Sequence, residues 1–215
     1  MTVPDGEALA QVASLRVMPR QARGREKLTR LLDAADRLLA AEGADAITTT
    51  RIAAEAGISV GSVYRYLPHR EAIIEALAQH YLGLIEQRMD EFAADLAARP
   101  RDPYQMVDDG IDTFAGFYRD HPGFRALWFG RHLTAETMEL DRAHKLAMAT
   151  RIRAMFVGMG IGRNDKRMLR IGQLIQLATD AVIQEAFRAD PNGDKPLLDQ
   201  LKVMIRGYVG ALVDG

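Results

Sequence analysis

Hydrophobic residues recur every three to four positions along most of the chain, which is the spacing of one face of an α-helix. The clearest run lies in residues 22–42, with apolar positions Leu28, Leu31, Leu32, Ala35, Leu38 and Leu39. Gly43 follows this run and predicts its end, since glycine commonly stops a helix. The same period predicts further helices over 48–55, 59–66, 68–98, 104–119, 124–129, 135–158, 164–188 and 196–213. No alternation typical of strands exceeds a few residues, so we expect an all-α fold of about nine helices.

Small and apolar residues in 48–71 have the spacing of a helix-turn-helix. Ala53 is small enough to stand where two helices cross, and Gly57 tolerates the positive φ of the turn. A small core is expected from Ile52, Ala56, Ile58 and Val63. Thr48 or Thr49 can cap the first helix and Ser59 the second. The alternative is a helical hairpin that only packs.

The second helix of this pair, residues 60–66, is expected to enter the major groove of DNA. Val60 can touch a thymine methyl group, Gly61 permits close approach, and Ser62 can donate or accept a hydrogen bond. Arg65 can pair with guanine or with phosphate, and Tyr64 is either a phosphate contact or a packing aromatic. The expected DNA contacts are Arg23, Arg25, Thr48, Thr50, Ser59, Val60, Gly61, Ser62, Tyr64, Arg65 and Arg70.

Charge is distributed unevenly although the net charge is only −1. Residues 16–30 hold six basic side chains against Glu26 alone, whereas 71–215 hold 18 basic and 21 acidic residues, a net of −3. Positive charge at one end suits a surface that faces phosphates. A solvated basic tail explains the pattern equally well. We therefore divide the chain into a flexible arm (1–21), a helix-turn-helix DNA-binding domain (22–67) and a ligand-binding and dimerisation domain (68–215).

Residues 24–71 resemble the N-terminal domain of the tetracycline-repressor (TetR) family of bacterial transcriptional regulators. The likeness is carried by Gly43, Thr48, the small residues of AAEAG (53–57), Ser59-Val60-Gly61, Tyr64, Tyr66 and Glu71. The chain departs from the family at Val60, often polar or basic there, and at Arg70, usually lysine. The resemblance implies a homodimer with about nine helices and repression relieved by a ligand.

The last two predicted helices are apolar on two sides, so each must be buried on both. One side can pack on its own domain and the other on a second copy, as the four-helix bundle of the family implies. The alternative is a deeply buried pair within one chain. The expected dimer contacts are Met168, Ile171, Ile175, Val182, Leu201, Met204 and Tyr208. Two recognition helices about one DNA turn apart would read a palindromic operator in double-stranded DNA.

Aromatic, methionine and amide side chains suggest a pocket for a small apolar or amphipathic ligand. The expected lining is Phe124, Trp128, Phe129, Met148, Phe156, Gln173 and Gln176. The same residues at helical spacing are equally consistent with an ordinary core.

Catalytic and metal-binding patterns are not found in the sequence. There is no cysteine, the five histidines are scattered, and no GxSxG or phosphate-binding glycine loop occurs, so no enzyme, metal or cofactor is expected. No apolar run approaches the roughly 20 residues that span a bilayer, and no signal peptide begins the chain, so we expect a cytoplasmic protein without membrane contact.

The sequence thus predicts a homodimeric repressor that a small molecule releases from its operator. A constitutive or activating regulator without a ligand, and a helical enzyme or interaction module, stay open as alternatives.

Overall fold

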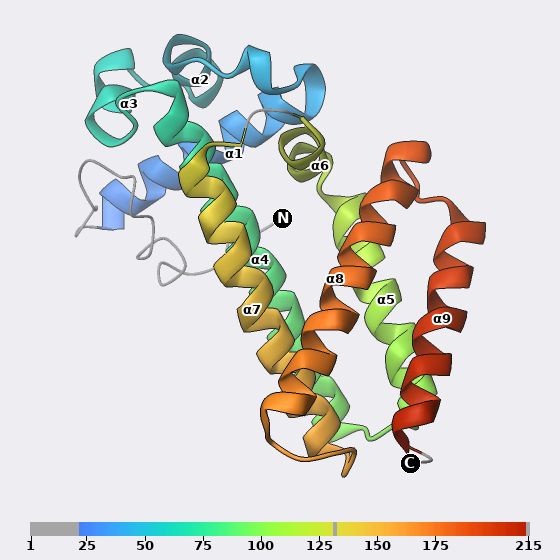
Figure 1. Cartoon of the computed structure of the whole chain (residues 1–215). Coiled ribbons are helices and arrows are strands. Elements are labelled where there is room, and N and C mark those ends of the chain that lie inside the picture. Colours follow the sequence, from blue (N-terminus) through green and yellow to red (C-terminus); the bar gives the residue numbers. More distant parts are fainter. Residues whose placement is uncertain (1–21, 131–132, 214–215) are drawn as a thin grey trace. The chain divides into compact units, whose positions relative to one another are not determined.

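The computed structural model describes residues 22–130 and 133–213, and every regular element within these ranges is helical. Figure 1 shows them in order: α1 (Ala22–Glu42), η2 (Ala44–Ala46), α2 (Thr49–Ala56), α3 (Val60–Tyr66), α4 (Arg70–Ala98), α5 (Pro103–Asp120), α6 (Pro122–Phe129), α7 (Ala135–Gly158), α8 (Lys166–Ala189) and α9 (Lys195–Val213). The predicted all-α fold is confirmed. None of the helices in the described ranges is both long and apolar enough to cross a membrane. The arm predicted over 1–21 lies outside them.

Helix ends follow local chemistry, with one departure from expectation. Gly43 ends α1 with a φ of 80°, as predicted. The long helix, predicted to start at about Pro68, begins two residues later, at Arg70. The ring Nδ1 of His69 accepts the backbone N–H of Ala72 at 3.2 Å, which satisfies one of the free donors of the first turn and sets the start after Pro68.

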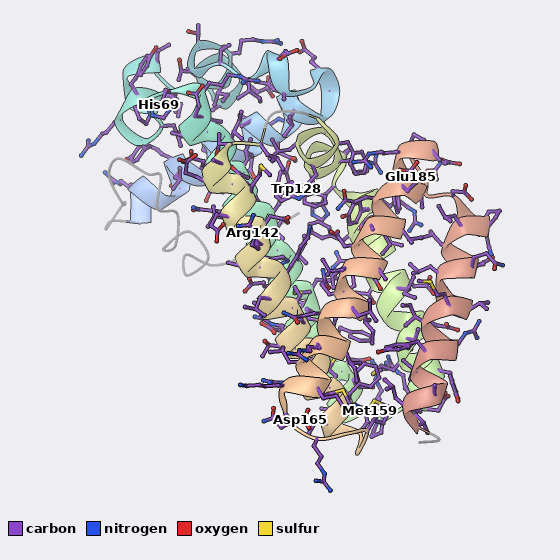
Figure 2. All side chains as sticks on the ribbon, in the orientation of Figure 1. His69, Trp128, Arg142, Met159, Asp165 and Glu185 are labelled. Atoms are coloured by element: carbon purple, nitrogen blue, oxygen red, sulfur yellow. The ribbon has the colours of Figure 1, made fainter. Side chains whose placement is uncertain are left out.

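The first of two compact units contains residues 22–84 together with 121–130 and 133–140 of the described chain. Here α6 packs on α1, and Phe124 lies between Tyr81 and Trp128, with ring centroids 5.6 Å and 4.4 Å away. Figure 2 labels Trp128 on α6. The hydroxyl of Tyr81 donates a hydrogen bond to Asp36 of α1. This unit therefore recruits α6 from far along the chain, which the sequence did not indicate.

The second unit contains residues 85–120 and 141–213 of the described chain. Within it α5 packs on both α8 and α9, and these two helices pack on each other. Ion pairs join α7 to the second half of α4: Arg151 Nε lies 2.7 Å from Asp90, and His144 Nδ1 lies 3.1 Å from Glu86. The helix α4 thus contributes its first half to one unit and its second half to the other.

Candidate nucleic-acid interface and internal cavity

The helix-turn-helix has the local geometry that its sequence predicts. Ala53 and Val63 are 2% and 0% exposed, and Gly57 has the left-handed φ of 65°. Thr48 Oγ1 accepts the backbone N–H of Arg51 at 3.2 Å, and Ser59 Oγ accepts that of Ser62 at 3.3 Å. Each hydroxyl accepts a hydrogen bond from an N–H group that has no partner within the helix, so α2 begins directly after Thr48 and α3 directly after Ser59.

Arginine side chains fix α2 against α1. Arg30 Nη2 donates to the carbonyl of Ala56 at 2.7 Å, where α2 ends and a free carbonyl needs a partner. Arg37 Nε donates to Glu55 at 2.8 Å. The arginine contacts hold α2 from its exposed side, and its buried residues hold it from the core. Because α2 is fixed in this way, α3, which follows it, has one orientation.

The outer face of α3 is exposed in the described chain. Val60 and Tyr64 are 37% and 48% exposed, and Arg65 is exposed with no hydrogen bond or ion pair to the described residues. A Cβ added to Gly61 would meet nothing within 4 Å, so the space above this residue is open. The opposite face, with Val63 and Tyr66, is buried. The exposure of Tyr64 favours a surface role over the packing alternative.

Other predicted contacts take structural positions as well. Thr48 and Ser59 are helix caps, and Ser62 Oγ lies 2.9 Å from Ser59 Oγ. Thr50 is exposed at the start of α2, and Arg23 is exposed in the first turn of α1. The side chain of Arg25 lies outside the described residues.

Arg70 has a partner that the sequence did not reveal. Its Nη2 donates to the carbonyl of Ala44 at 2.8 Å and lies 3.7 Å from Asp45. Both belong to η2, the short turn that joins α1 to α2 and that periodicity does not predict. The guanidinium therefore ties the start of α4 to this turn, and only what remains of its donors can face a phosphate.

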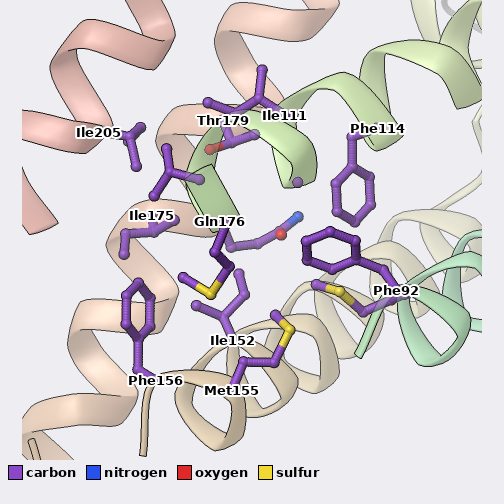
Figure 3. Close-up of a pocket in the computed structure, with 14 residues that line it drawn as sticks. Phe92, Ile111, Phe114, Ile152, Met155, Phe156, Ile175, Gln176, Thr179 and Ile205 are labelled. Carbon is purple, nitrogen blue, oxygen red and sulfur yellow. The ribbon is translucent and has the colours of Figure 1, made fainter. Parts of the chain in front are cut away.

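The second unit contains a cavity of about 60 Å³ between α4, α5, α7, α8 and α9. Figure 3 shows its walls. The lining residues are Met89, Phe92, Met106, Val107, Gly110, Ile111, Phe114, Ile152, Met155, Phe156, Ile175, Gln176, Thr179 and Ile205. A space of this size admits a few water molecules, and the three methionines can change shape around a larger guest.

The structure brings only part of the predicted pocket to this cavity. Phe156 and Gln176 line it, whereas Gln173 and Met148 do not. Phe124, Trp128 and Phe129 belong to the first unit, where the first two are buried around Tyr81. For Phe124, Trp128 and Met148 the core alternative holds. Sequence reasoning missed Met89 and Phe92 of α4, because an apolar helix face does not reveal whether it meets a filled or a hollow interior.

The predicted dimer contacts need a correction. Met168, Ile171, Ile175 and Leu201 are buried within their own unit, so a partner cannot reach them. Val182 and Tyr208 are half-buried, and Met204 is 49% exposed. On α8 the other apolar side is the accessible one, since Leu174 and Leu177 are 52% and 55% exposed. On α9 the exposed apolar residues are Val203 and Met204, at 55% and 49%. The sequence shows two apolar sides on each helix but not which one faces inward.

A rigid helix-turn-helix with an open outer face, attached to a larger helical region, defines the class of helix-turn-helix transcriptional regulators. The profile described as "Bacterial regulatory proteins, tetR family" matches residues 31–77, and "Tetracyclin repressor-like, C-terminal domain" matches residues 101–213. The chain belongs to the TetR family of DNA-binding regulators, which are not enzymes.

Individual relatives are more distant. The uncharacterized HTH-type transcriptional regulator YerO of Bacillus subtilis is 30% identical over 126 residues, 58% of this chain and 43% of that protein. The nucleoid occlusion factor SlmA of Pasteurella multocida is 35% identical over 103 residues, 46% of this chain and 48% of that protein. The chain thus matches about half the length of these curated relatives.

Solved structures agree over more of the chain. A TetR-family transcriptional regulator from Streptomyces coelicolor superposes with a TM-score of 0.66 at 27% identity, covering 86% of this chain and 99% of that one. FadR from Bacillus subtilis, in complex with stearoyl-CoA, gives a TM-score of 0.61 at 14% identity, covering 81% and 97%. The second likeness shows the fold alone.

Proposed function

We propose that the protein is a homodimeric transcriptional repressor that binds a palindromic operator through α3 and leaves it when a small molecule enters the second unit. The observation that carries the DNA-binding part is the exposed, unpartnered face of α3, where Tyr64 and Arg65 flank the open space above Gly61. In this proposal residues 22–67 read DNA, residues 68–215 bind ligand and partner, and the protein acts in the bacterial cytoplasm.

The exposed apolar stripe of α8 and α9 supports a second copy of the chain. Leu174, Leu177, Val203 and Met204 are each about half exposed in the single chain. The two helices that carry these side chains pack on each other, and exposed apolar residues gathered on neighbouring elements are typical of an association site. Pairing is also needed for specificity, because one recognition helix supplies only a few base contacts worth about 1–3 kcal/mol each.

The helix α4 supports ligand control. It runs without interruption from Arg70, four residues after α3, to Ala98, and its residues Met89 and Phe92 line the cavity. The cavity is far smaller than the roughly 300–1,000 Å³ of pockets that hold drug-sized ligands, so a guest must enlarge it. A guest that moves Phe92 moves a rigid helix whose other end follows the recognition helix. The coupling required is about 1–3 kcal/mol.

Selection of bound sites from random double-stranded DNA tests the first part. We expect a palindrome with half-sites about one helical turn apart. No enrichment at low salt would overturn the DNA-binding part and favour an interaction module. Binding that no compound relieves would favour the constitutive regulator.

Sedimentation of the Leu177→Glu variant tests the dimer. A carboxylate in an apolar interface loses its hydration without a partner, so we expect monomers and weak operator binding. Leu146→Glu is the matched control, since Leu146 is 48% exposed on α7, away from this stripe. A Leu177→Glu protein that sediments as the parent dimer does would refute the interface.

A further inference from the structure

The walls of the cavity contain no charged side chain. Of its fourteen lining residues, three are phenylalanines, three are methionines, and only Gln176 and Thr179 are polar. An ionised group placed among such residues would lose its hydration without gaining a counter-charge, which is strongly unfavourable. The cavity therefore discriminates by charge as well as by shape.

Gln176 and Thr179 are the polar residues that a guest would meet. They lie three residues apart on α8, on one helix face, and neither makes a hydrogen bond within the described part of the chain. Figure 3 shows the amide of Gln176 extended toward the rings of Phe92 and Phe114. An amide and a hydroxyl in apolar surroundings are stabilised by a partner, and a guest's carbonyl or hydroxyl supplies one.

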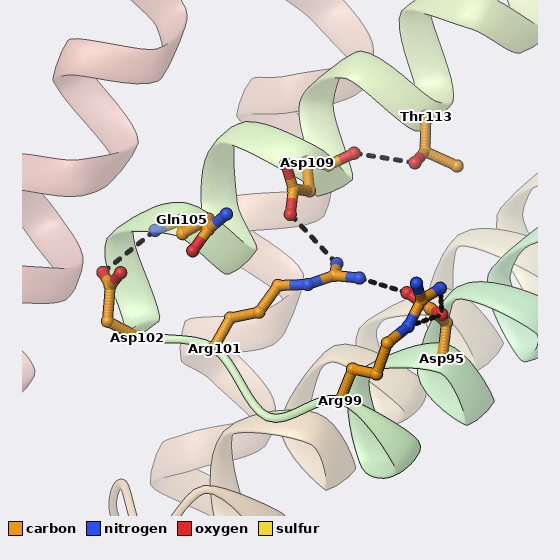
Figure 4. A network of polar contacts seen from close by, with 7 residues as sticks. All are labelled: Asp95, Arg99, Arg101, Asp102, Gln105, Asp109 and Thr113. Carbon is orange, nitrogen blue, oxygen red and sulfur yellow. Dashed lines mark hydrogen bonds and ion pairs between the residues drawn. The ribbon is translucent and has the colours of Figure 1, made fainter.

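An open groove of about 640 Å³ adjoins the cavity and shares Met155 with it. Arg101 and Arg151 line this groove, and both are already neutralised. Arg101 Nη1 lies 2.9 Å from Asp109, and Arg101 also pairs with Asp95 (Figure 4). Arg151 pairs with Asp90 at 2.7 Å and with Glu86 at 3.2 Å.

The carboxylates that pair with these two arginines are held in their charged form. Hydrogen bonds from Arg99 and Arg101 lower the pKa of Asp95. A hydrogen bond from His144, followed by the charges of His144 and Arg151, lowers the pKa of Glu86. A carboxylate or phosphate arriving in the groove would have to displace these anions from their arginines. Neither of the two arginines that line the groove is thus a spare cation for an anionic ligand.

We infer that the cavity binds an uncharged, mainly aromatic or aliphatic molecule with one hydrogen-bonding group, which Gln176 and Thr179 hold. This inference rests on the proposed ligand control and specifies its ligand. It separates the protein from its structural neighbour FadR, whose complex contains stearoyl-CoA, a ligand with several phosphates.

Fluorescence titration of the full chain with three probes tests the inference. The first is propionyl-dimethylaminonaphthalene, which is uncharged and carries one carbonyl; the others are anilinonaphthalene sulfonate, of similar size with a fixed negative charge, and stearoyl-CoA. We expect the uncharged probe to bind at least about tenfold more tightly than either anion, because a buried unpaired charge costs more than one factor of ten. Equal or tighter binding of an anion would overturn the inference.

Variants assign the binding to this cavity. Gln176→Leu should weaken the uncharged probe about fivefold, the worth of one hydrogen bond, and shift its emission toward that of an aprotic solvent. Gly110→Leu should abolish binding, because the new side chain starts 3.6 Å from the ring of Phe92 and fills the cavity. If Gly110→Leu lowers the melting temperature, Thr179→Val is used in its place. This variant should weaken the uncharged probe and shift its emission in the same direction as Gln176→Leu, by a smaller amount. Unchanged affinity and emission in both polar variants would refute the assigned residues.

Binding to the selected DNA, measured by anisotropy on the same preparations, separates the two proposals. Loss of all DNA binding with the probe ranking intact would overturn the proposed function and leave the ligand class standing. Normal DNA binding with an inverted ranking would overturn the ligand class alone.

Discussion

The packing around α6 in the first compact unit differs from the packing around the cavity in the second. In the first, α6 lies so close to its neighbours that a Cβ on Gly123 would collide with the carboxylate of Asp36 and the hydroxyl of Tyr81. In the second, a Cβ on Gly110 would lie 3.6 Å from Phe92, an ordinary contact, beside a cavity. The first interior leaves no room for added atoms beside Gly123, whereas the second has some beside its cavity. A surface that must fit DNA needs the former, and a site that must accept a guest needs the latter.

The largest expected effect on the free energy of unfolding comes from replacing Gly123 by alanine, with the same replacement of Gly110 as its counterpart. Gly123→Ala should destabilise the protein by about 3 kcal/mol, since overpacking adds to the loss of the hydrogen bond between Tyr81 and Asp36. Burial raises the pKa of the Tyr81 phenol, so this donor keeps its proton throughout the neutral range. Denaturant unfolding measures the change.

The matched variant Gly110→Ala should be neutral or stabilise by up to about 1 kcal/mol, because alanine favours a helix interior. The comparison between the units fails if the two substitutions have similar effects on the free energy of unfolding.

A smaller effect is expected on the recognition surface. Arg65→Ala should lower the affinity for the selected DNA by roughly tenfold to a hundredfold, the worth of one base or close phosphate contact. Arg51→Ala is the control, because Arg51 Nη1 donates to Glu42 at 2.9 Å and is occupied within the protein. Anisotropy titrations measure both. An equal loss in the two variants would mean that the unpartnered state of Arg65 has no bearing on binding.

The smallest effect is expected at Arg70, which ties α4 to η2. Arg70→Ala should lower the free energy of unfolding by about 1 kcal/mol through the lost hydrogen bond to Ala44. If the role is positional, DNA affinity should fall without a change in its dependence on salt. A phosphate contact would instead reduce the slope of log affinity against log salt by about 1. Titrations at several salt concentrations distinguish the two.

Local spacing predicted the DNA-reading unit well because its geometry is decided within a few residues. A cap at Thr48, a turn at Gly57 and a crossing at Ala53 each depend on near neighbours in the chain. The turn η2 and the role of Arg70 were missed for the opposite reason. The hydrogen bond between Arg70 and Ala44 joins residues 26 positions apart, and no periodic pattern records it.

The second unit was predicted in outline only. Helix limits near 135–158 and 164–188 match α7 and α8 closely. The apolar pattern of α7 stops at Gly158, and Asp165 caps the start of α8. The burial of Ile175 and the exposure of Leu177 could not be predicted, because both sides of α8 are apolar. The cavity combines residues of five helices. Such a set is defined only after the helices have packed.

Most arginines of the described helix-turn-helix region are occupied, and this affects how the protein finds its site. Arg30, Arg37, Arg51 and Arg70 each have a partner among Ala56, Glu55, Glu42 and Ala44, and each must release that partner before it can fully engage a phosphate. Where these partners stay in place, the four arginines displace few counterions, so we expect only brief residence on DNA of arbitrary sequence. The proposed regulator would then search by many short visits rather than by long sliding, and would stay long only at an operator.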